Sequence, residues 1–246
     1  MASTDRKERE KEQRKNAIID AAEKLFFSRG FDNVSMEDIA KEVELGKGTL
    51  YLYFQNKDSL FFAIALRKAH GLHKKFTECM ESGGCGREKS HRMGESLFEF
   101  AKQNQDYYRM VCTVGPTLFR KTDNLDAKEV LDLMVKDLCL HRDVLREGME
   151  DGTVRSDLHP LEMAVFLSIM SMSVTCLDPA WKKLLGAEGI SYGQFMADYL
   201  VFIGNAVDKL PDAGELNGDY DTDKCRYNYS VQKKRDEKSA LLTKHC

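Results

Sequence analysis

The stretch from Ser35 to Leu60 carries basic, hydroxyl and aromatic side chains at close spacing, and such side chains contact the phosphates and base edges of nucleic acids. Its sequence is SMEDIAKEVELGKGTLYLYFQNKDSL. After Gly46 it fits a short helix, whose outward side chains would be Lys47, Thr49, Tyr51, Leu52 and Tyr53. This mixture favours an interface with DNA over a catalytic centre.

Two short helices joined by about three residues account for this stretch, and that is the spacing of a helix-turn-helix. Ser35 and Asp38 have the spacing of a capping box at the start of the first helix. Four apolar side chains can form the core between the two helices: Ile39, Val43, Leu50 and Phe54. An earlier helix is expected to end near Gly30, and a longer one is expected from Lys57 to about Lys75.

Helical periodicity continues along the chain, and no segment alternates with the period of a strand for long enough to predict a sheet. Residues 82–94 form a polar, glycine-rich break. Further helices are expected at about 95–104, 106–121, 126–150, 161–177 and 191–210. From Pro211 onward few aliphatic residues remain, which predicts a mobile tail.

The stretch resembles the TetR family of transcriptional regulators (TetR/AcrR type), and the similarity covers residues 16–66. The pattern K-G-T-L-Y-x-Y-F-x-x-K-x-x-L begins at Lys47, while Leu25-Phe26 and Gly30-Phe31 fit the family's first helix. A looser pattern of the same family's regulatory domain is matched by residues 147–160. The resemblance implies an all-α fold, in which a three-helix helix-turn-helix DNA-binding domain precedes a helical-bundle regulatory and dimerisation domain.

The resemblance also implies which residues meet DNA: Ser35, Lys47, Gly48, Thr49, Tyr51, Leu52, Tyr53 and Lys57. By this likeness Tyr51, Tyr53 and Lys57 hold phosphates, whereas Lys47, Gly48 and Thr49 lie close to the bases. Leu52 would make an apolar base contact, for example with a thymine methyl.

One departure from the family pattern lies in the turn, where Glu44-Leu45-Gly46 replaces the usual Gly-Val-Ser. Glu44 lacks the freedom of glycine at positive φ, and Gly46 replaces a hydroxyl cap. Both changes bear on the geometry of the turn and on base preference.

The last two expected helices are apolar nearly all round, so each needs a partner on both sides. The economical partner is a second copy of the chain, packed as a four-helix bundle, and the alternative is a fully internal helix pair. The candidate dimer residues are Phe166, Met170, Val174, Phe195, Tyr199, Phe202 and Ala206.

Aromatic, methionine and histidine side chains in the second half of the chain could line a pocket for a flat or greasy ligand, or could be ordinary core. The candidates are Phe98, Tyr107, Tyr108, Met110, Phe119, Met134, His141 and Trp181. His70 and His73 match no standard zinc spacing, and neither a metal site nor a cofactor is expected.

Charge and cysteine content limit the partners and the cellular compartment that can be expected for the chain. It carries 37 Lys and Arg against 40 Asp and Glu, a net charge of −3, which excludes a uniformly basic coat for nucleic acid. The first sixteen residues are charged throughout and the longest uncharged run, 163–177, is short, so no signal peptide and no membrane span are expected. In the cytoplasmic chain so predicted, the 7 cysteines are expected to be reduced, with thiol sensing as the alternative.

The domains expected from these patterns are a charged N-terminal arm (1–15), a DNA-binding domain (16–63), a ligand-binding and dimerisation domain (64–210) and the tail (211–246). The hypothesis is a cytoplasmic, ligand-responsive transcriptional repressor and not an enzyme. It would bind a near-palindromic double-stranded operator as a homodimer and be released by a small, apolar or aromatic effector. The alternative is an all-helical small-molecule-binding or interaction protein whose N-terminal motif no longer recognises DNA.

Overall fold

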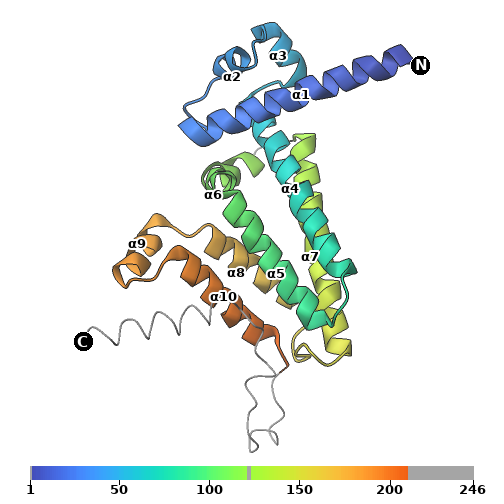
Figure 1. Cartoon of the computed structure of the whole chain (residues 1–246), viewed down its shortest axis with the longest axis vertical. Coiled ribbons are helices and arrows are strands. Elements are labelled where there is room, and N and C mark those ends of the chain that lie inside the picture. Colours follow the sequence, from blue (N-terminus) through green and yellow to red (C-terminus); the bar gives the residue numbers. More distant parts are fainter. Residues whose placement is uncertain (1, 121–122, 210–246) are drawn as a thin grey trace, which may run out of the picture.

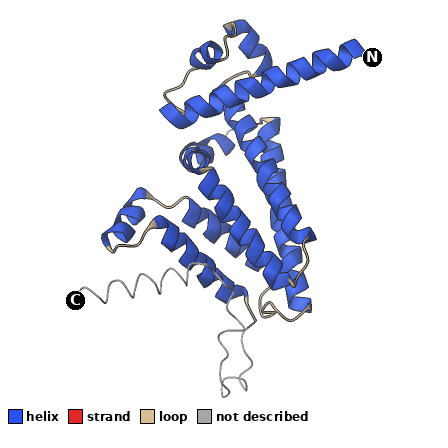
Figure 2. Ribbon diagram, in the orientation of Figure 1, coloured by secondary structure: helices blue, strands red, loops and turns tan. Residues whose placement is uncertain are grey.

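A computed structural model describes residues 2–120 and 123–209 of the chain. This part forms ten α-helices and no strand, apart from an isolated antiparallel bridge between Val154 and Asp208 (Figure 2). The predicted all-α class is confirmed. The helices are α1 (Ala2–Arg29), α2 (Met36–Glu42), α3 (Lys47–Tyr53), α4 (Lys57–Glu81), α5 (Gly86–Gln103), α6 (Gln105–Phe119), α7 (Leu125–Glu150), α8 (Pro160–Thr175), α9 (Pro179–Ala187) and α10 (Tyr192–Val207).

The helices gather in two bodies (Figure 1). α1, α2 and α3 form the smaller body at one end, where α1 crosses the start of α4. α4 continues into the larger body and packs along α7, which also contacts α5 and α8. α6 lies between the bodies and touches α1 as well as α4 and α5.

A single apolar core joins the smaller body to the beginning of the larger one. It includes Ile18 of α1, Ile39 of α2 and Leu50 of α3, which are all fully buried. It extends to Met110 of α6 and Val130 of α7. A second core lies among α5, α7, α8 and α10. The helix-turn-helix is therefore not an appendage, because its own core continues into α6 and α7.

The first helix is longer than expected, because the charged residues 2–15 of the predicted arm continue α1. Opposite charges one turn apart support this extension, as in the 2.8 Å ion pair between Arg6 and Glu10.

The expected break at 82–94 is shorter than predicted, since α5 already begins at Gly86. Glycine is required there because an added Cβ would lie 2.1 Å from the backbone nitrogen of Gly148 on α7. The backbone of Gly86 also donates to the Asp151 carboxylate over 2.8 Å. A glycine that looks like a loop signal therefore marks close packing between two helices.

The short helix α9 was not predicted, although Asp178 caps it and Pro179 occupies its first turn, as is common at helix starts.

The expected tail, residues 211–246, lies outside the described residues. Within the described ranges, none of the helices by itself combines the length and apolar character needed to cross a membrane. Only α8 and α9 taken together, bent by 75°, satisfy that test.

The turn between α2 and α3 has the geometry of a Schellman cap. The N–H of Leu45 donates to the Ala40 carbonyl at 2.8 Å, and that of Glu44 to the Lys41 carbonyl at 3.2 Å. Glu44 has a φ of 53°, in the left-handed region that favours glycine. The anomaly seen in the sequence is thus a non-glycine residue held in a glycine conformation.

Replacing Glu44 with glycine should relieve this strain and stabilise the helix-turn-helix by about 1 kcal/mol. Thermal unfolding followed by circular dichroism should show a midpoint higher by about 2–4 °C. Glu44→Ala is the matched control, because alanine removes the carboxylate but keeps the strained φ. Equal gains from both variants would attribute the effect to charge and contradict a strained turn.

Candidate DNA interface and effector cavity

The seven-residue helix α3 presents one face to solvent and anchors the other in the core. Leu50 is fully buried, and Phe54 directly after the helix is also buried. On the outer face Leu52 is 84% exposed, Tyr51 is exposed, and the space around Gly48 is open for 4 Å. Tyr53 is half-buried against the core. Of the predicted DNA contacts, Gly48, Tyr51 and Leu52 are the freest.

Lys47, at the start of α3, forms an ion pair with Glu37 of α2. Its ammonium lowers the pKa of the Glu37 carboxyl, and the carboxylate raises the pKa of Lys47 in turn. Both side chains are more than half exposed, so water screens the pair and it is easily opened. Lys47 can therefore reach a phosphate or base edge once its ion pair with Glu37 is broken.

Ser35 caps α2 as the sequence predicts. Its hydroxyl accepts from the N–H of Asp38 at 3.2 Å, and its own N–H donates to the Asp38 carboxylate at 2.9 Å. The Ser35 hydroxyl also donates to the Asp38 carboxylate at 2.5 Å, and this bond, together with the one from the Ser35 N–H, lowers the pKa of Asp38. Ser35 is exposed at the edge of the same face, but its hydroxyl already has a structural partner.

Lys57, expected from the family pattern to hold a phosphate, is engaged inside the protein. Its Nζ donates to the Phe31 carbonyl at 2.7 Å and lies 4.4 Å from the centre of the Phe31 ring. These contacts tie the start of α4 to the loop after α1. Phosphate contact by Lys57 stays a prediction, with a structural role beside it.

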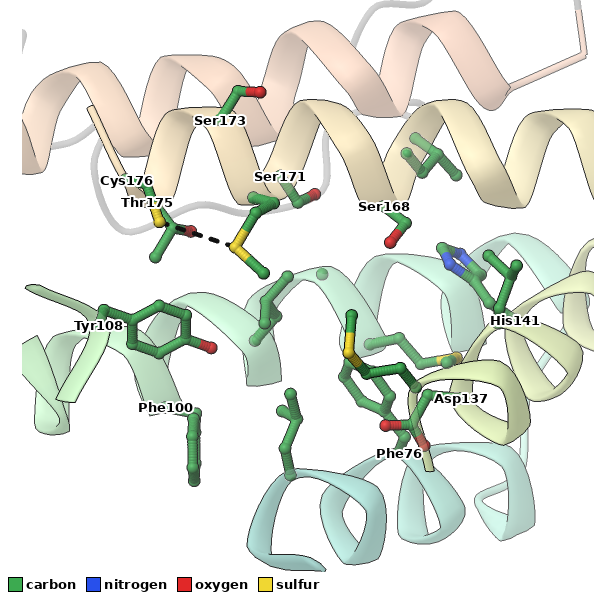
Figure 3. Close-up of a pocket in the computed structure, with 18 of the residues that line it drawn as sticks. Phe76, Phe100, Tyr108, Asp137, His141, Ser168, Ser171, Ser173, Thr175 and Cys176 are labelled. Atoms are coloured by element: carbon green, nitrogen blue, oxygen red, sulfur yellow. Dashed lines mark hydrogen bonds between the residues drawn. The ribbon is translucent and has the colours of Figure 1, made fainter. Parts of the chain in front are cut away.

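A cavity of about 1020 Å³ lies among α4, α5, α6, α7, α8 and α10 of the larger body (Figure 3). Five of the predicted pocket residues line it: Tyr107, Tyr108, Phe119, Met134 and His141. Its wall is mainly apolar, which suits a ligand with a large apolar part.

Three predicted pocket residues lie elsewhere. Phe98 packs edge-on against Tyr199 in the second core, with ring centres 5.5 Å apart. Met110 faces the core of the DNA-binding body. Trp181 is 59% exposed on α9. An apolar side chain on a helix meets core, cavity or solvent according to how the helix is turned, and composition alone does not reveal that.

The polar groups of the cavity gather around α7. His141 Nε2 lies 2.9 Å from the Ser90 hydroxyl of α5, and burial lowers the pKa of His141 to about 4. His141 is therefore neutral at pH 7. Nearby, Asp137 pairs with His73 of α4 at 2.5 Å, and burial raises the pKa of the Asp137 carboxyl. The cavity thus offers hydrogen bonds from a neutral imidazole and a hydroxyl.

Five polar residues that line the cavity were not predicted from the sequence: Ser90, Asp137 and the hydroxyl residues of α8, Ser168, Ser171 and Thr175 (Figure 3). A signal for the last three was present, since positions three and four apart share one helix face. Hydroxyls along one face of an otherwise apolar helix point to a wall that must accept polar atoms.

Two cysteines depart from the expectation that all are reduced. Cys112 of α6 and Cys176, the residue after α8, form a disulfide with Cα atoms 6.0 Å apart. Both line the cavity, and Cys176 lies beside Thr175 at the end of the cavity near Tyr108 (Figure 3). The expectation relied on an assumed compartment, whereas this pairing depends on the fold, which brings together residues separated by 64 positions.

The candidate dimer residues divide between the surface and the interior. Phe166 is 55% exposed and Phe202 is 63% exposed; Met170 and Ala206 are exposed as well. Val174 and Phe195 are half-buried. Tyr199 was misassigned, because it is buried in its own protomer with its hydroxyl 3.2 Å from that of Ser171.

The comparisons with known proteins agree with this architecture. Residues 18–64 match the family described as bacterial regulatory proteins, tetR family. The chain is 27% identical over 173 residues to the uncharacterized HTH-type transcriptional regulator YhgD of Bacillus subtilis (strain 168). The aligned region covers 69% of this chain and 85% of YhgD.

Two solved structures illustrate the likeness in fold. A transcriptional regulator of the TetR/AcrR family from Thermobifida fusca superposes with a TM-score of 0.64 at 21% identity, covering 78% of this chain and 97% of the other. AibR, solved with isovaleryl coenzyme A and operator DNA, has a TM-score of 0.59 at 16% identity and covers 77% and 97%.

The neutral state of His141 predicts a loss of stability in acid. The unfolded chain protonates this histidine below a pH of about 6.5, whereas the folded chain resists protonation until about 4, so the free energy of unfolding falls as the pH drops across this window. Urea unfolding at pH 7 and pH 4.5 should show that His141→Gln loses about 2 kcal/mol less than the natural chain. Equal losses would contradict a neutral His141.

Proposed function

Because the chain is a DNA-binding transcriptional regulator of the TetR family, we propose that it represses transcription as a homodimer on a near-palindromic operator and is released by a small, largely apolar effector. Such regulators bind DNA and are not enzymes. The observation that carries the proposal is the shared core, which links the buried side of α3 to α6, a wall of the cavity.

The DNA-binding part of the proposal rests on what α3 exposes. A seven-residue helix anchored by Leu50 can enter the major groove, with Thr49 and Leu52 near base edges and Tyr51 near phosphates. Lys47 would exchange Glu37 for DNA. Because that ion pair is exposed, the exchange costs little.

The dimer rests on the outer faces of α8 and α10. Phe166, Met170 and Phe202 expose large apolar side chains there, and Ala206 lets another helix approach closely. Burying this surface against the same surface of a second copy would form a four-helix bundle. Such a bundle holds the two α3 helices at a fixed separation.

The effector is proposed to occupy the cavity of about 1020 Å³, with its apolar part along the wall and a polar group near His141 and Ser90. AibR, which shares the fold, was solved with isovaleryl coenzyme A, which supports the proposal that this chain also binds a small molecule. To release DNA, the effector must bind more tightly to a state in which α6 and the recognition helices are placed differently. The chain would act in the cytoplasm, where the DNA is.

The DNA contacts can be tested on duplexes selected by the chain from a random-sequence pool. Tyr51→Phe should weaken binding to every selected sequence, because it removes a phosphate contact. Thr49→Val should change base preference at one position of each half-site by about 1–3 kcal/mol. Lys57 is a poorer probe, because its substitution also disturbs Phe31.

Fluorescence anisotropy across the selected sequences measures both effects. A uniform loss from Thr49→Val, or no change from Tyr51→Phe, would contradict the proposed docking of α3. If the pool yields no preferred sequence at all, the proposed repressor is contradicted. The alternative, a binding protein that has lost DNA recognition, is then favoured.

The dimer is tested by Phe202→Arg, which places a charge in the proposed bundle and should yield monomers by light scattering. Operator binding should be lost with the dimer, because two half-sites must be held about 34–36 Å apart. Leu184→Arg is the matched control, since Leu184 is also an exposed apolar residue but lies on α9.

The natural dimer should also lose binding when about five base pairs, half a helical turn, are inserted between the half-sites. If the Phe202→Arg chain stays dimeric, the dimer interface does not include Phe202. Indifference to the insertion would contradict the fixed separation of the two recognition helices.

A further inference from the structure

The disulfide between Cys112 and Cys176 forms part of the wall of the cavity. Cys112 lies in the middle of α6, and Cys176 directly follows α8, so the bond connects two helices that are far apart in sequence. Both residues are half-buried and both line the cavity. Cys176 Sγ also lies 3.6 Å from the Met172 sulfur, as the dashed line in Figure 3 shows. Small solutes that enter the cavity can therefore reach these sulfurs.

The other cysteines of the described part have no such arrangement. Cys79 is buried, with its Sγ 3.4 Å from the Ser96 hydroxyl, while Cys85 and Cys139 are half-buried free thiols. Cys225 and Cys246 lie outside the described residues. Within residues 2–120 and 123–209, the cavity pair is thus distinguished by geometry and by access to the cavity.

One end of the disulfide is attached to the helix that contacts the DNA-binding body. Phe119 of α6 packs against Phe61 and Phe62 of α4, with ring centres 6.2 and 5.1 Å apart. Gly115, one turn before Phe119 on α6, also faces Phe61. The other end is attached to α8, whose outer face is proposed to meet the second copy. The bond therefore fixes α6 relative to the frame on which the dimer would be built.

We propose that Cys112 and Cys176 form a reversible oxidation site for peroxides, which locks α6 in the position seen here. In a cytoplasmic protein a disulfide of this kind is expected to form and break in use and not to be a permanent brace. The reversibility of the bond rests on the proposed cytoplasmic function, whereas the pairing and its effect on α6 do not.

The reaction balances with hydrogen peroxide as the oxidant. One thiolate attacks the peroxide, giving a sulfenic acid and hydroxide, which takes the proton to become water. The second thiol attacks the sulfenic sulfur, forms the S–S bond and releases another water. Two thiols lose two electrons and two protons, and one peroxide becomes two waters. A dithiol reductant reverses the change by thiol–disulfide exchange.

The expected consequence is a gain in operator affinity on oxidation. In the reduced chain α6 is free to move relative to α8, and binding DNA must then restrict that motion. The disulfide restricts it beforehand, so the oxidised chain loses less conformational entropy on binding. We expect the oxidised chain to bind its selected duplex about three- to tenfold more tightly than the reduced chain.

The first measurement needs neither DNA nor effector. The full chain, reduced with dithiothreitol and freed of it, is treated with hydrogen peroxide, and its intact mass should fall by about 2 Da through loss of two hydrogens. Peptide mapping should join the Cys112 and Cys176 peptides. Amide hydrogen exchange along residues 105–119 should be about tenfold slower in the oxidised chain.

The matched variants are Cys112→Ser and Cys176→Ser, which should abolish both changes, and Cys139→Ser, which should leave both intact. Cys112→Ala serves if the serine disturbs folding, and the mapping of the natural chain stands without any variant. The proposal is overturned if Cys112 remains a thiol, is oxidised to a sulfinic acid, or bonds to another cysteine. It is also overturned if α6 exchanges equally fast in both states.

The DNA measurement separates the two proposals. A disulfide that maps to this pair and slows α6, together with unchanged operator affinity, would overturn the inferred effect on binding and leave the homodimeric repressor in place. Failure to select any DNA sequence would contradict the proposed function while the oxidation site still stands on mapping and exchange.

Discussion

The contact of Phe119 with Phe61 and Phe62 is the interaction on which the rest of this architecture depends. These rings join α6 to the start of α4 inside the core that also holds Leu50, the anchor of the recognition helix. Apolar packing is dense and tolerates little change in volume, so a displacement of α6 must be absorbed by its neighbours. The cavity and the DNA-binding face are therefore two sides of one packed unit.

The sequence was most informative where short-range chemistry determines structure. The capping box at Ser35, the spacing of Ile39 and Leu50, and the family pattern from Lys47 each depend on residues close in the chain, and the structure has them as predicted. Glu44 was recognised as unusual from residue type alone, since only backbone sterics are involved.

Long-range placement was much less predictable. Lys57 has a family role that its contact with Phe31 complicates, and Tyr199 looks like an interface residue but lies inside. Both outcomes depend on which part of the chain lies beside the residue in the folded protein. The Cys112–Cys176 pair had no local signature, because only the folding of the whole chain brings the middle of α6 close to the residue that follows α8. A pattern within one helix identifies an apolar side chain but not the neighbour it meets.

The close approach of Gly86 and Gly148 has a mechanical consequence for the larger body. With no side chain between them, the backbones of α5 and α7 touch near the end that is remote from the DNA-binding body, and Lys89 adds a bond of 2.6 Å to Glu147 there. The two helices are thus held together most tightly at this end. We therefore expect a ligand that enlarges the cavity to separate them first at their opposite ends, which lie beside α6.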